Sequence, residues 1–376
     1  MRISGQSHNG LVRAQAIAGS HVVTLGMNMS EHDTGGLLGF GIHRTDKTEN
    51  EAYWLEGQKR FQITDPGLPA GAKVPTNKHP IQSFLWGDFT AKPSHQYTYR
   101  LVAIRGTPEA PVEAEAIDLS VDTEDVNRGA ISSQAYTARF GERKPPEVGA
   151  EAYDWLSRGL KEAMIRFIAK ASGGNYKLRA AIYEFQLPAI LDAFHSAKMT
   201  GADIQIIYDA KSNSKGPKAK NESAIKDEQI KDICIPRASN PSYIAHNKFI
   251  VLIERGIPIE VWTGSTNVTD NGVFGHLNVG HLVRDREIAA TYLKYWDELA
   301  EDPQASALKP VTVGISPAPT NVAVQDGRVA VFSPRPSVDA LNWYVTLMGE
   351  ARAAAFITGA FGIPAPFVPL FKTRQA

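Results

Sequence analysis

The stretch "IAHNKFIVLIERGIPIEVWTGSTNVTDNG", residues 244–272, decides the fold of the second half of this chain. Its apolar run FIVLI, a turn at Glu254–Arg255–Gly256 and the second run IPIEVWTG predict a β-hairpin. His246 and Lys248 stand two residues apart, so a strand places both on one face. The returning strand brings three further polar side chains back towards them: Thr263, Ser265 and Asn267.

This set of side chains suits phosphoryl transfer. A neutral imidazole is a nucleophile towards phosphorus and also an acid or base near neutral pH. A lysine ammonium on the same face can bind a phosphate oxygen and stabilise the charge that develops in the transition state. Serine and asparagine side chains offer further hydrogen bonds. None of these steps needs a carboxylate or thiolate cluster, so the pattern predicts chemistry without a metal.

The order His246-Asn-Lys248, apolar hairpin, Gly264-Ser265-Thr-Asn267 resembles the HxK…GSxN signature of the phospholipase D superfamily. The resemblance extends over about residues 150–302 and includes the flanking stretches AIYEF and ILDAFHSAKMTGADIQIIYDA. It implies an α/β fold, a mixed sheet with flanking helices, and a phosphodiesterase that uses no metal or organic cofactor.

The resemblance also assigns roles to the matching positions. His246 is expected to form a phosphohistidine or to act as the acid–base partner of such a nucleophile. Lys248, Ser265 and Asn267 are expected to bind phosphate, and Asn278 resembles a further polar position that follows the motif. The alternative is a histidine at a strand end beside a surface lysine. His276 and His281 lie outside the motif and are taken as structural.

Two features depart from the family pattern. The position five residues after Lys248, where the family usually has aspartate, is Ile253. The hairpin is also longer than usual, with fifteen residues between Lys248 and Gly264. The family's aspartate lies away from the phosphate, so its replacement leaves the proposed chemistry intact.

Residues 211–232 form a polar segment whose first half carries four lysines: Lys211, Lys215, Lys218 and Lys220. One interpretation is a solvated loop that leads into a helix. The other is a substrate rim, because contacts to a phosphate backbone require positive charge more than a particular sequence.

The first 128 residues contain short β-type segments separated by glycine, proline, aspartate and asparagine, which favours an all-β sandwich. In YTYRLVAI, residues 97–104, Tyr97, Tyr99 and Leu101 alternate with other side chains, and this strand resembles one of a fibronectin type III domain. Residues 129–150 are a predicted linker. Alternating helical and strand patterns in 151–308 predict the phospholipase D-like repeat.

Residues 309–376 are interpreted as the start of a second, incomplete repeat. After a predicted linker at 309–321 come a strand at 327–334, a helix at 338–350 and a strand at 351–362, and the triplet Arg-Ala-Ala recurs at Arg179 and Arg352. The sequence holds no second HxK, although such enzymes use two. The chain is therefore expected to be a fragment of a longer enzyme, to pair with a second subunit, or to be an inactive relative.

The composition excludes several classes of protein. Forty basic and forty acidic residues balance, so no net charge recruits a polyanion. A lone cysteine, Cys234, excludes an intramolecular disulfide and is expected to lie in a core. No secretory signal is evident, and Pro364, Pro366 and Pro369 interrupt the longest apolar run, so we expect a cytoplasmic protein without a transmembrane segment.

These observations lead to one functional hypothesis with two alternatives. We expect a bacterial nuclease-like hydrolase that acts on nucleic acid through a phosphohistidine. The first alternative is a phospholipase or phosphatidyltransferase acting on phospholipids. The second is an inactive binding or adhesion protein.

Overall fold

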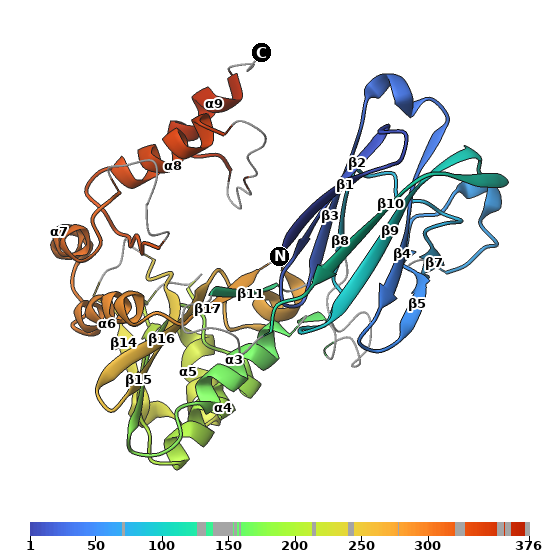
Figure 1. Cartoon of the computed structure of the whole chain (residues 1–376). Coiled ribbons are helices and arrows are strands. Elements are labelled where there is room, and N and C mark those ends of the chain that lie inside the picture. Colours follow the sequence, from blue (N-terminus) through green and yellow to red (C-terminus); the bar gives the residue numbers. More distant parts are fainter. Residues whose placement is uncertain are drawn as a thin grey trace. The chain divides into compact units, whose positions relative to one another are not determined.

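The computed structural model describes residues 1–69, 72–125, 133–137, 153, 156, 157, 159–212, 216–239, 244–276, 278–319, 328–351, 357 and 362–372. The chain divides into two compact units, Met1–Gly129 and Ala130–Ala376 (Figure 1). Within the described ranges, no helix has both the length and the apolar character needed to cross a membrane.

The first unit is a sandwich of two antiparallel sheets, as the sequence predicts. One sheet has the order β1 (Arg2–Gln6), β2 (Val12–Ala18), β3 (Val23–Met29) and β8 (Leu85–Asp88). The other has the order β10 (Ala110–Asp122), β9 (Gln96–Thr107), β4 (Leu37–Asp46) and β5 (Glu51–Trp54). Three smaller elements lie in the connections: η1 (Glu31–Thr34), η2 (Gln62–Thr64) and the pair β6 (Glu56–Gly57) with β7 (Val74–Pro75).

Alternating side chains build the core of the sandwich. Tyr97, Tyr99 and Leu101 of β9 are each buried, which confirms the predicted inward face. They pack with apolar residues of β2, β3, β4 and β10 in one cluster. Strand β2, which the sequence pattern did not predict, alternates buried alanines and Val12 with exposed Arg13, Gln15 and Ile17. Small alanine side chains suffice on its inner face because the large tyrosines of the opposite sheet fill the space.

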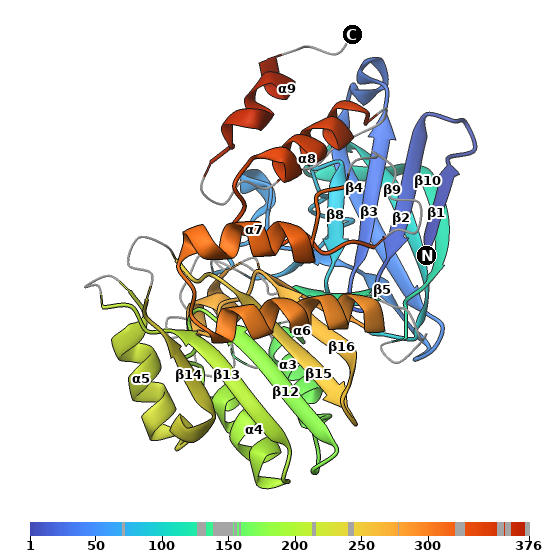
Figure 2. The same ribbon diagram turned by 90° about the vertical axis from the view of Figure 1, so that its left-hand side faces the viewer.

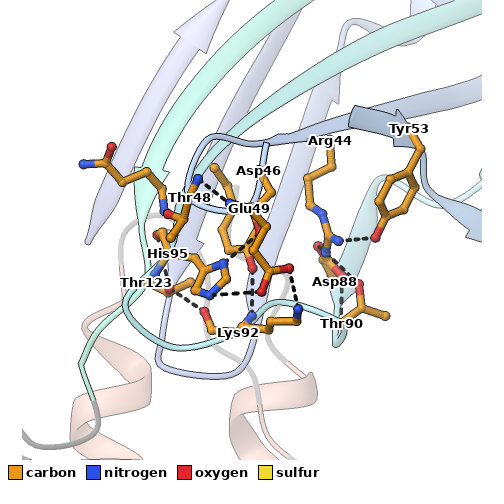
Figure 3. Close-up of polar contacts among 12 residues, drawn as sticks. Arg44, Asp46, Thr48, Glu49, Tyr53, Asp88, Thr90, Lys92, His95 and Thr123 are labelled. Carbon is orange, nitrogen blue, oxygen red and sulfur yellow. Dashed lines mark hydrogen bonds and ion pairs between the residues drawn. The ribbon is translucent and has the colours of Figure 1, made fainter. Parts of the chain in front are cut away.

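A buried ion pair lies beside the edge strand β8 (Figure 3). Arg44 Nη1 donates to Asp88 Oδ2 at 2.9 Å and to Thr90 Oγ1 at 2.7 Å, and Tyr99 donates its hydroxyl to Asp88 at 2.7 Å. A second guanidinium nitrogen of Arg44 donates to the Tyr53 hydroxyl. Burial next to Asp88 raises the pKa of Tyr99. The pair links β4, β8 and β9 across the two sheets.

A second polar network ties two turns together at the same end of the sandwich (Figure 3). Asp46 accepts hydrogen bonds from the backbone N–H groups of Thr48 and Glu49 at 2.9 and 3.1 Å and contacts His95 Nδ1 at 2.8 Å. Lys92 pairs with Glu49. Burial alone would raise the pKa of Asp46, but these hydrogen bonds outweigh it and hold the pKa below its ordinary value.

Replacing Asp88 by alanine is expected to destabilise the sandwich by about 3–5 kcal/mol, because it leaves the buried Arg44 guanidinium without its counter-ion. Chemical denaturation of the full chain, followed by tryptophan fluorescence, measures the effect. Asp118→Ala is the matched control, since its pair with Arg100 is solvent-exposed and should change stability by less than about 0.5 kcal/mol. Equal stability of the two variants would contradict the structural role of Asp88.

The second unit contains a seven-stranded mixed sheet. Its order is β11 (Ser133–Thr137), β17 (Val279–Val283), β16 (Ile257–Gly264), β15 (Lys248–Glu254), β12 (Tyr176–Ile182), β13 (Asp203–Asp209) and β14 (Cys234–Arg237). β12, β13 and β14 run parallel to one another, and the remaining neighbours are antiparallel. The structure thus has the predicted α/β class, preceded by an all-β sandwich.

Helices cover both faces of this sheet (Figures 1 and 2). α3 (Leu160–Ala169) and α4 (Pro188–Met199) pack on one face, with Ile225 of α5 (Lys218–Asp227) in the same core cluster. On the other face lie α6 (Arg286–Ala300) and α7 (Ala305–Ile315). Further elements are η3 (Lys231–Ile233), the π-helical turn η4 (Asn271–Gly275), α8 (Asp339–Gly349), η5 (Ala365–Phe367) and α9 (Val368–Lys372). Cys234 is half-buried, and burial raises its pKa to about 12.

The region after α6 departs from the sequence prediction. The predicted linker at 309–321 is largely helix α7, whose Leu308 joins the core beneath α6 and whose Thr312 hydroxyl donates to the Leu308 carbonyl. No strand forms among residues 328–334, where Phe332 packs instead against Tyr295 of α6 with ring centroids 4.4 Å apart. Helix α8 agrees with the predicted helix at 338–350. The Arg352 triplet and Trp155 lie outside the described residues.

Candidate active site

Four strands have their ends side by side along one border of the sheet, where strands begin or end; this border is called the edge of the site. Strand β15 runs antiparallel to both β12 and β16, so its first residue lies beside their last residues: Lys248 is opposite Ile182, and Phe249 is opposite Thr263. β17 then returns with Gly280 opposite Gly264. The segments that follow β12 and β16, and those that precede β15 and β17, therefore converge at this edge.

His246 and Lys248 lie together here, with Tyr183 beside them. The His246 side chain is solvent-exposed, and its ring meets the Tyr183 ring edge-on with centroids 4.7 Å apart. The half-buried Lys248 donates from Nζ to the His246 carbonyl at 2.9 Å, and Nζ lies 5.5 Å from the centre of the Tyr183 ring. A backbone bond of 2.9 Å from Tyr183 N–H to the Asn247 carbonyl fixes the two segments to each other.

The electrostatic environment favours a neutral His246 imidazole and lowers the pKa of Lys248 towards neutral pH. Although His246 is exposed to solvent, neighbouring protein atoms partly desolvate its ring; this partial desolvation, and then the positive charge of Lys248, lower the pKa of His246. Burial lowers the pKa of Lys248 to about 8, and the negative charge of Glu184 opposes that shift. Near neutral pH this pair thus combines an unprotonated nucleophile with a mostly charged ammonium.

Ser265 belongs to a short chain of hydrogen bonds. Its hydroxyl donates to Asn278 Oδ1 at 3.0 Å and accepts from the Val279 backbone N–H at 3.0 Å. Asn278 in turn donates from Nδ2 to the Gly272 carbonyl at 2.8 Å. Since the amide of Asn278 is held on both sides, this residue orients Ser265. The predicted role of Asn278 in binding phosphate stays a prediction.

Asn267 is held by an acidic residue that the sequence analysis did not select. Its Nδ2 donates to the Glu184 carboxylate, while its Oδ1 is buried and has no hydrogen-bond partner among the described residues. Backbone contacts fix this pairing, because Val268 N–H donates to the Glu184 carbonyl at 3.1 Å and Val268 bridges to Phe185.

Two glycines permit the close approach of β16 and β17 at this edge. A Cβ atom on Gly264 would lie 2.0 Å from the Val279 carbonyl oxygen, and one on Gly280 would lie 2.3 Å from the Trp262 ring. Any larger residue at either position would push the strands apart. The glycine of the GSxN stretch is thus required by packing as well as by the turn that follows.

The predicted lysine rim is only partly present. Lys211 is buried with its Nζ 4.0 Å from Asp209 Oδ2, so it does not form part of an exposed rim. Lys218 lies near Ser212 and Glu222. Lys220 is exposed and lines a hollow of about 260 Å³ together with acidic side chains of α5. Lys215 lies outside the described residues.

The position where the family carries aspartate lies at the other end of β15. Ile253 is buried in the core cluster beneath α6, and the neighbouring Glu254 accepts a hydrogen bond from the Tyr176 hydroxyl at 3.1 Å. The length of strand β15 lies between these two residues and His246. The replacement of aspartate by isoleucine therefore changes the core and leaves the candidate site unaltered.

Among the described residues, the histidine and acidic side chains that could jointly hold a metal are Asp46, Glu49 and His95 of the sandwich, not residues of this edge. Tyr183 and Glu184 could have been found from the sequence, because they follow the buried run of β12 in AIYEF. Apolar periodicity does not identify such residues, but a charged residue two positions after a buried strand can indicate a functional site.

The electrostatic account predicts a coupling between His246 and Lys248. In Lys248→Ala, the pKa of His246 should rise towards its ordinary value, because the positive neighbour is gone while most of the burial remains. Imidazole chemical shifts measured by NMR across pH 4–9 report it. His281 is the internal control, since burial alone lowers its pKa and Lys248 should not affect it. An equal change in the pKa values of His246 and His281 would contradict the electrostatic coupling of Lys248 to His246.

Comparison with protein families gives one match to the α/β unit. Residues 164–300 match the family described as cardiolipin synthase, PLD-like domain. Of solved structures, this chain is similar to Nuc, a phospholipase D family member from Salmonella typhimurium, at 21% identity over 45% of this chain and 93% of that one, with a TM-score of 0.33. NucT from Helicobacter pylori has 20% identity over 46% and 97% of the two chains, with a TM-score of 0.32.

Curated proteins give a different similarity. An L-ascorbate oxidase of Cucurbita maxima is 27% identical over 193 residues, which cover 44% of this chain and 31% of that protein. An L-ascorbate oxidase of Cucurbita pepo var. melopepo is 29% identical over 176 residues, or 39% and 29% of the two chains. The chain spans about a third of the length of these curated relatives.

Proposed function

Because the α/β unit belongs to the phospholipase D superfamily, we propose that this protein is a metal-independent phosphodiesterase whose nucleophile is His246. The observation that carries the proposal is the placement of an exposed His246 beside Lys248, whose Nζ donates to the His246 carbonyl, at the edge where Ser265 and Asn267 also lie.

The proposed reaction has two displacements. In the first, an unprotonated nitrogen of His246 attacks phosphorus, a P–N bond forms, and the P–O bond to the leaving alcohol breaks. In the second, a water oxygen attacks phosphorus, the P–N bond breaks, and the water gives a proton to the group that protonated the leaving alcohol; this releases a phosphomonoester and restores the imidazole. Lys248 binds a phosphate oxygen throughout and stabilises the charge that grows on it in each transition state.

The remaining protein groups orient the phosphate. Ser265, held by Asn278 and the Val279 N–H, can turn its hydroxyl towards a phosphate oxygen. Asn267 uses one N–H for Glu184 and retains a second for substrate. Tyr183 packs edge-on against the imidazole and restricts its rotation.

The leaving alcohol needs a proton donor, and we propose that a second HxK histidine supplies it. That histidine would come from a C-terminal part of a longer protein or from a second subunit. An obligate pairing of subunits makes specific activity rise with protein concentration, whereas a donor within one chain makes it independent of concentration.

For the substrate we propose nucleic acid, with a phospholipid as the alternative. Both present the same phosphodiester to His246, and they differ in what surrounds it. Lys220 is exposed in a hollow that also contains Gln186, two residues after Glu184, and its charge would favour a polyanionic backbone there. The cardiolipin synthase description of the matching family favours testing a lipid in parallel.

Incubation of the protein with plasmid DNA, and separately with phosphatidylcholine vesicles, both in excess EDTA, tests the proposal. We expect turnover of one substrate in EDTA and a loss of at least about 1,000-fold in His246→Ala, because the nucleophile is removed. His276→Ala, an exposed histidine outside the motif, is the control and should retain activity. Complete inhibition by EDTA would refute the metal-free mechanism, and unchanged activity in His246→Ala would refute the site and favour an inactive binding protein.

The pH profile provides a separate test. kcat/KM should begin to rise at a pH below the ordinary pKa of histidine, because the lowered pKa of His246 leaves its imidazole unprotonated at lower pH. It should fall again as pH rises through about 8, where Lys248 loses its charge. In Lys248→Arg the guanidinium stays charged, so this alkaline fall should move to higher pH. An alkaline fall that stays near 8 in Lys248→Arg would show that another group causes it.

A further inference from the structure

Glu184 is an unexpected group at a site for an anion. A carboxylate repels a phosphodiester, so a residue of this charge beside Lys248 and Asn267 needs a physical reason. Glu184 immediately follows Tyr183, and its main chain is fixed to the segment after β16 by the bond from the Val268 N–H. Its side chain is half-buried, and its carboxylate accepts from Asn267 Nδ2.

We propose that Glu184 is a positioning residue of this site, which aims the carboxamide of Asn267 at the substrate phosphate and offsets the charge of Lys248. The proposal rests on the proposed function, since the phosphate is the group to be bound. Glu184 itself need not touch the substrate.

The first part of the argument concerns the amide orientation. A carboxamide can present either its oxygen or its NH₂ group to a phosphate, and only the NH₂ group is attractive. An ionised carboxylate accepts hydrogen bonds and cannot donate them, so it selects the Asn267 orientation in which Nδ2 faces Glu184. Asn267 Oδ1 then points into the protein, where it is buried. The second N–H of Nδ2 remains available for substrate.

The second part concerns charge. Lys248 is half-buried, and this burial favours its neutral form. Among the described residues, the titratable groups around Lys248 are Glu184 after β12 and His246 before β15. Asp209, at the end of β13, influences the neighbouring Tyr183. Of these, Glu184 is the group that raises the pKa of Lys248. Without it, less of the lysine would be charged at the pH of the reaction.

Two variants separate these roles. Glu184→Gln keeps an oxygen that can accept from Asn267 but removes the charge, whereas Glu184→Ala removes both. Glu254→Gln is the matched control, because it neutralises a carboxylate of the same sheet that is bonded to Tyr176 at the opposite edge. Three quantities are measured: the Lys248 pKa by NMR of labelled lysine side chains, the affinity for inorganic phosphate by calorimetry at pH 6 and pH 8, and the pH profile of turnover.

In Glu184→Gln we expect a lower Lys248 pKa, an alkaline limb of turnover that begins at lower pH, and phosphate affinity about fivefold weaker at pH 8 but within about twofold at pH 6. In Glu184→Ala we expect phosphate affinity about tenfold weaker at both pH values, because Asn267 loses its partner. At pH 6, where Lys248 stays charged without Glu184, Asn267→Ala combined with Glu184→Ala should cost little more than Asn267→Ala alone. The Glu254→Gln control should match the wild type.

Failure of this proposal is distinguishable from failure of the proposed function. If the wild type turns over no phosphodiester, the Lys248 pKa still tests the electrostatic influence of Glu184 on Lys248. A Lys248 pKa that is the same in Glu184→Gln and wild type would overturn the proposal, whatever the activity. Phosphate binding that is tighter in Glu184→Gln at both pH values would also overturn it, since Glu184 would then act by direct repulsion of the ligand.

Discussion

The structure of the α/β unit depends on the antiparallel ladder between β12 and β15. This pairing places Lys248 beside Ile182, and thereby sets the HxK segment against the residues that follow β12. A slip of one residue would turn Lys248 and the apolar side chains of β15 to the opposite faces of the sheet. The two core clusters on either side of β15 oppose such a slip, because alternate residues of this strand, Ile250 and Leu252 on one side and Val251 and Ile253 on the other, are buried in different clusters.

The chemistry proposed for this edge follows from partial burial. A fully exposed lysine and histidine would keep their ordinary pKa values, and deeply buried ones would be neutral and inaccessible. Here the sheet and Tyr183 cover enough of Lys248 to lower its pKa to about 8, and Glu184 prevents a larger change. His246 remains exposed, so an incoming phosphate can reach it. The same edge thus combines access for the substrate with control of protonation.

The sequence predicted the parts of this structure that have a regular pattern. The hairpin, the helix at 338–350 and the inward face of β9 follow from apolar periodicity, which reflects burial directly. The pattern failed where burial depends on partners distant in the chain. Strand β2 is built from alanines that need the tyrosines of the other sheet, and α7 is a helix because Leu308 packs beneath α6. For the same reason the sequence identified His246 and Lys248 by their spacing but not Glu184, whose role depends on Asn267, 83 residues further along the chain.

The long hairpin also affects how the family motif can vary. The turn lies at Arg255 and Gly256, both with positive φ, at the edge of the sheet opposite His246. The residues between Lys248 and Gly264 therefore extend the strands away from the proposed chemistry, in register except for the shift between the Leu252–Glu260 and Ile253–Pro258 pairs. A change in hairpin length that preserves the pairing of Lys248 with Ile182 therefore alters the distal tip and leaves the end that carries Lys248 in place. The same tip offers a place to attach a fluorescent label or an affinity tag away from the residues that we propose to bind phosphate.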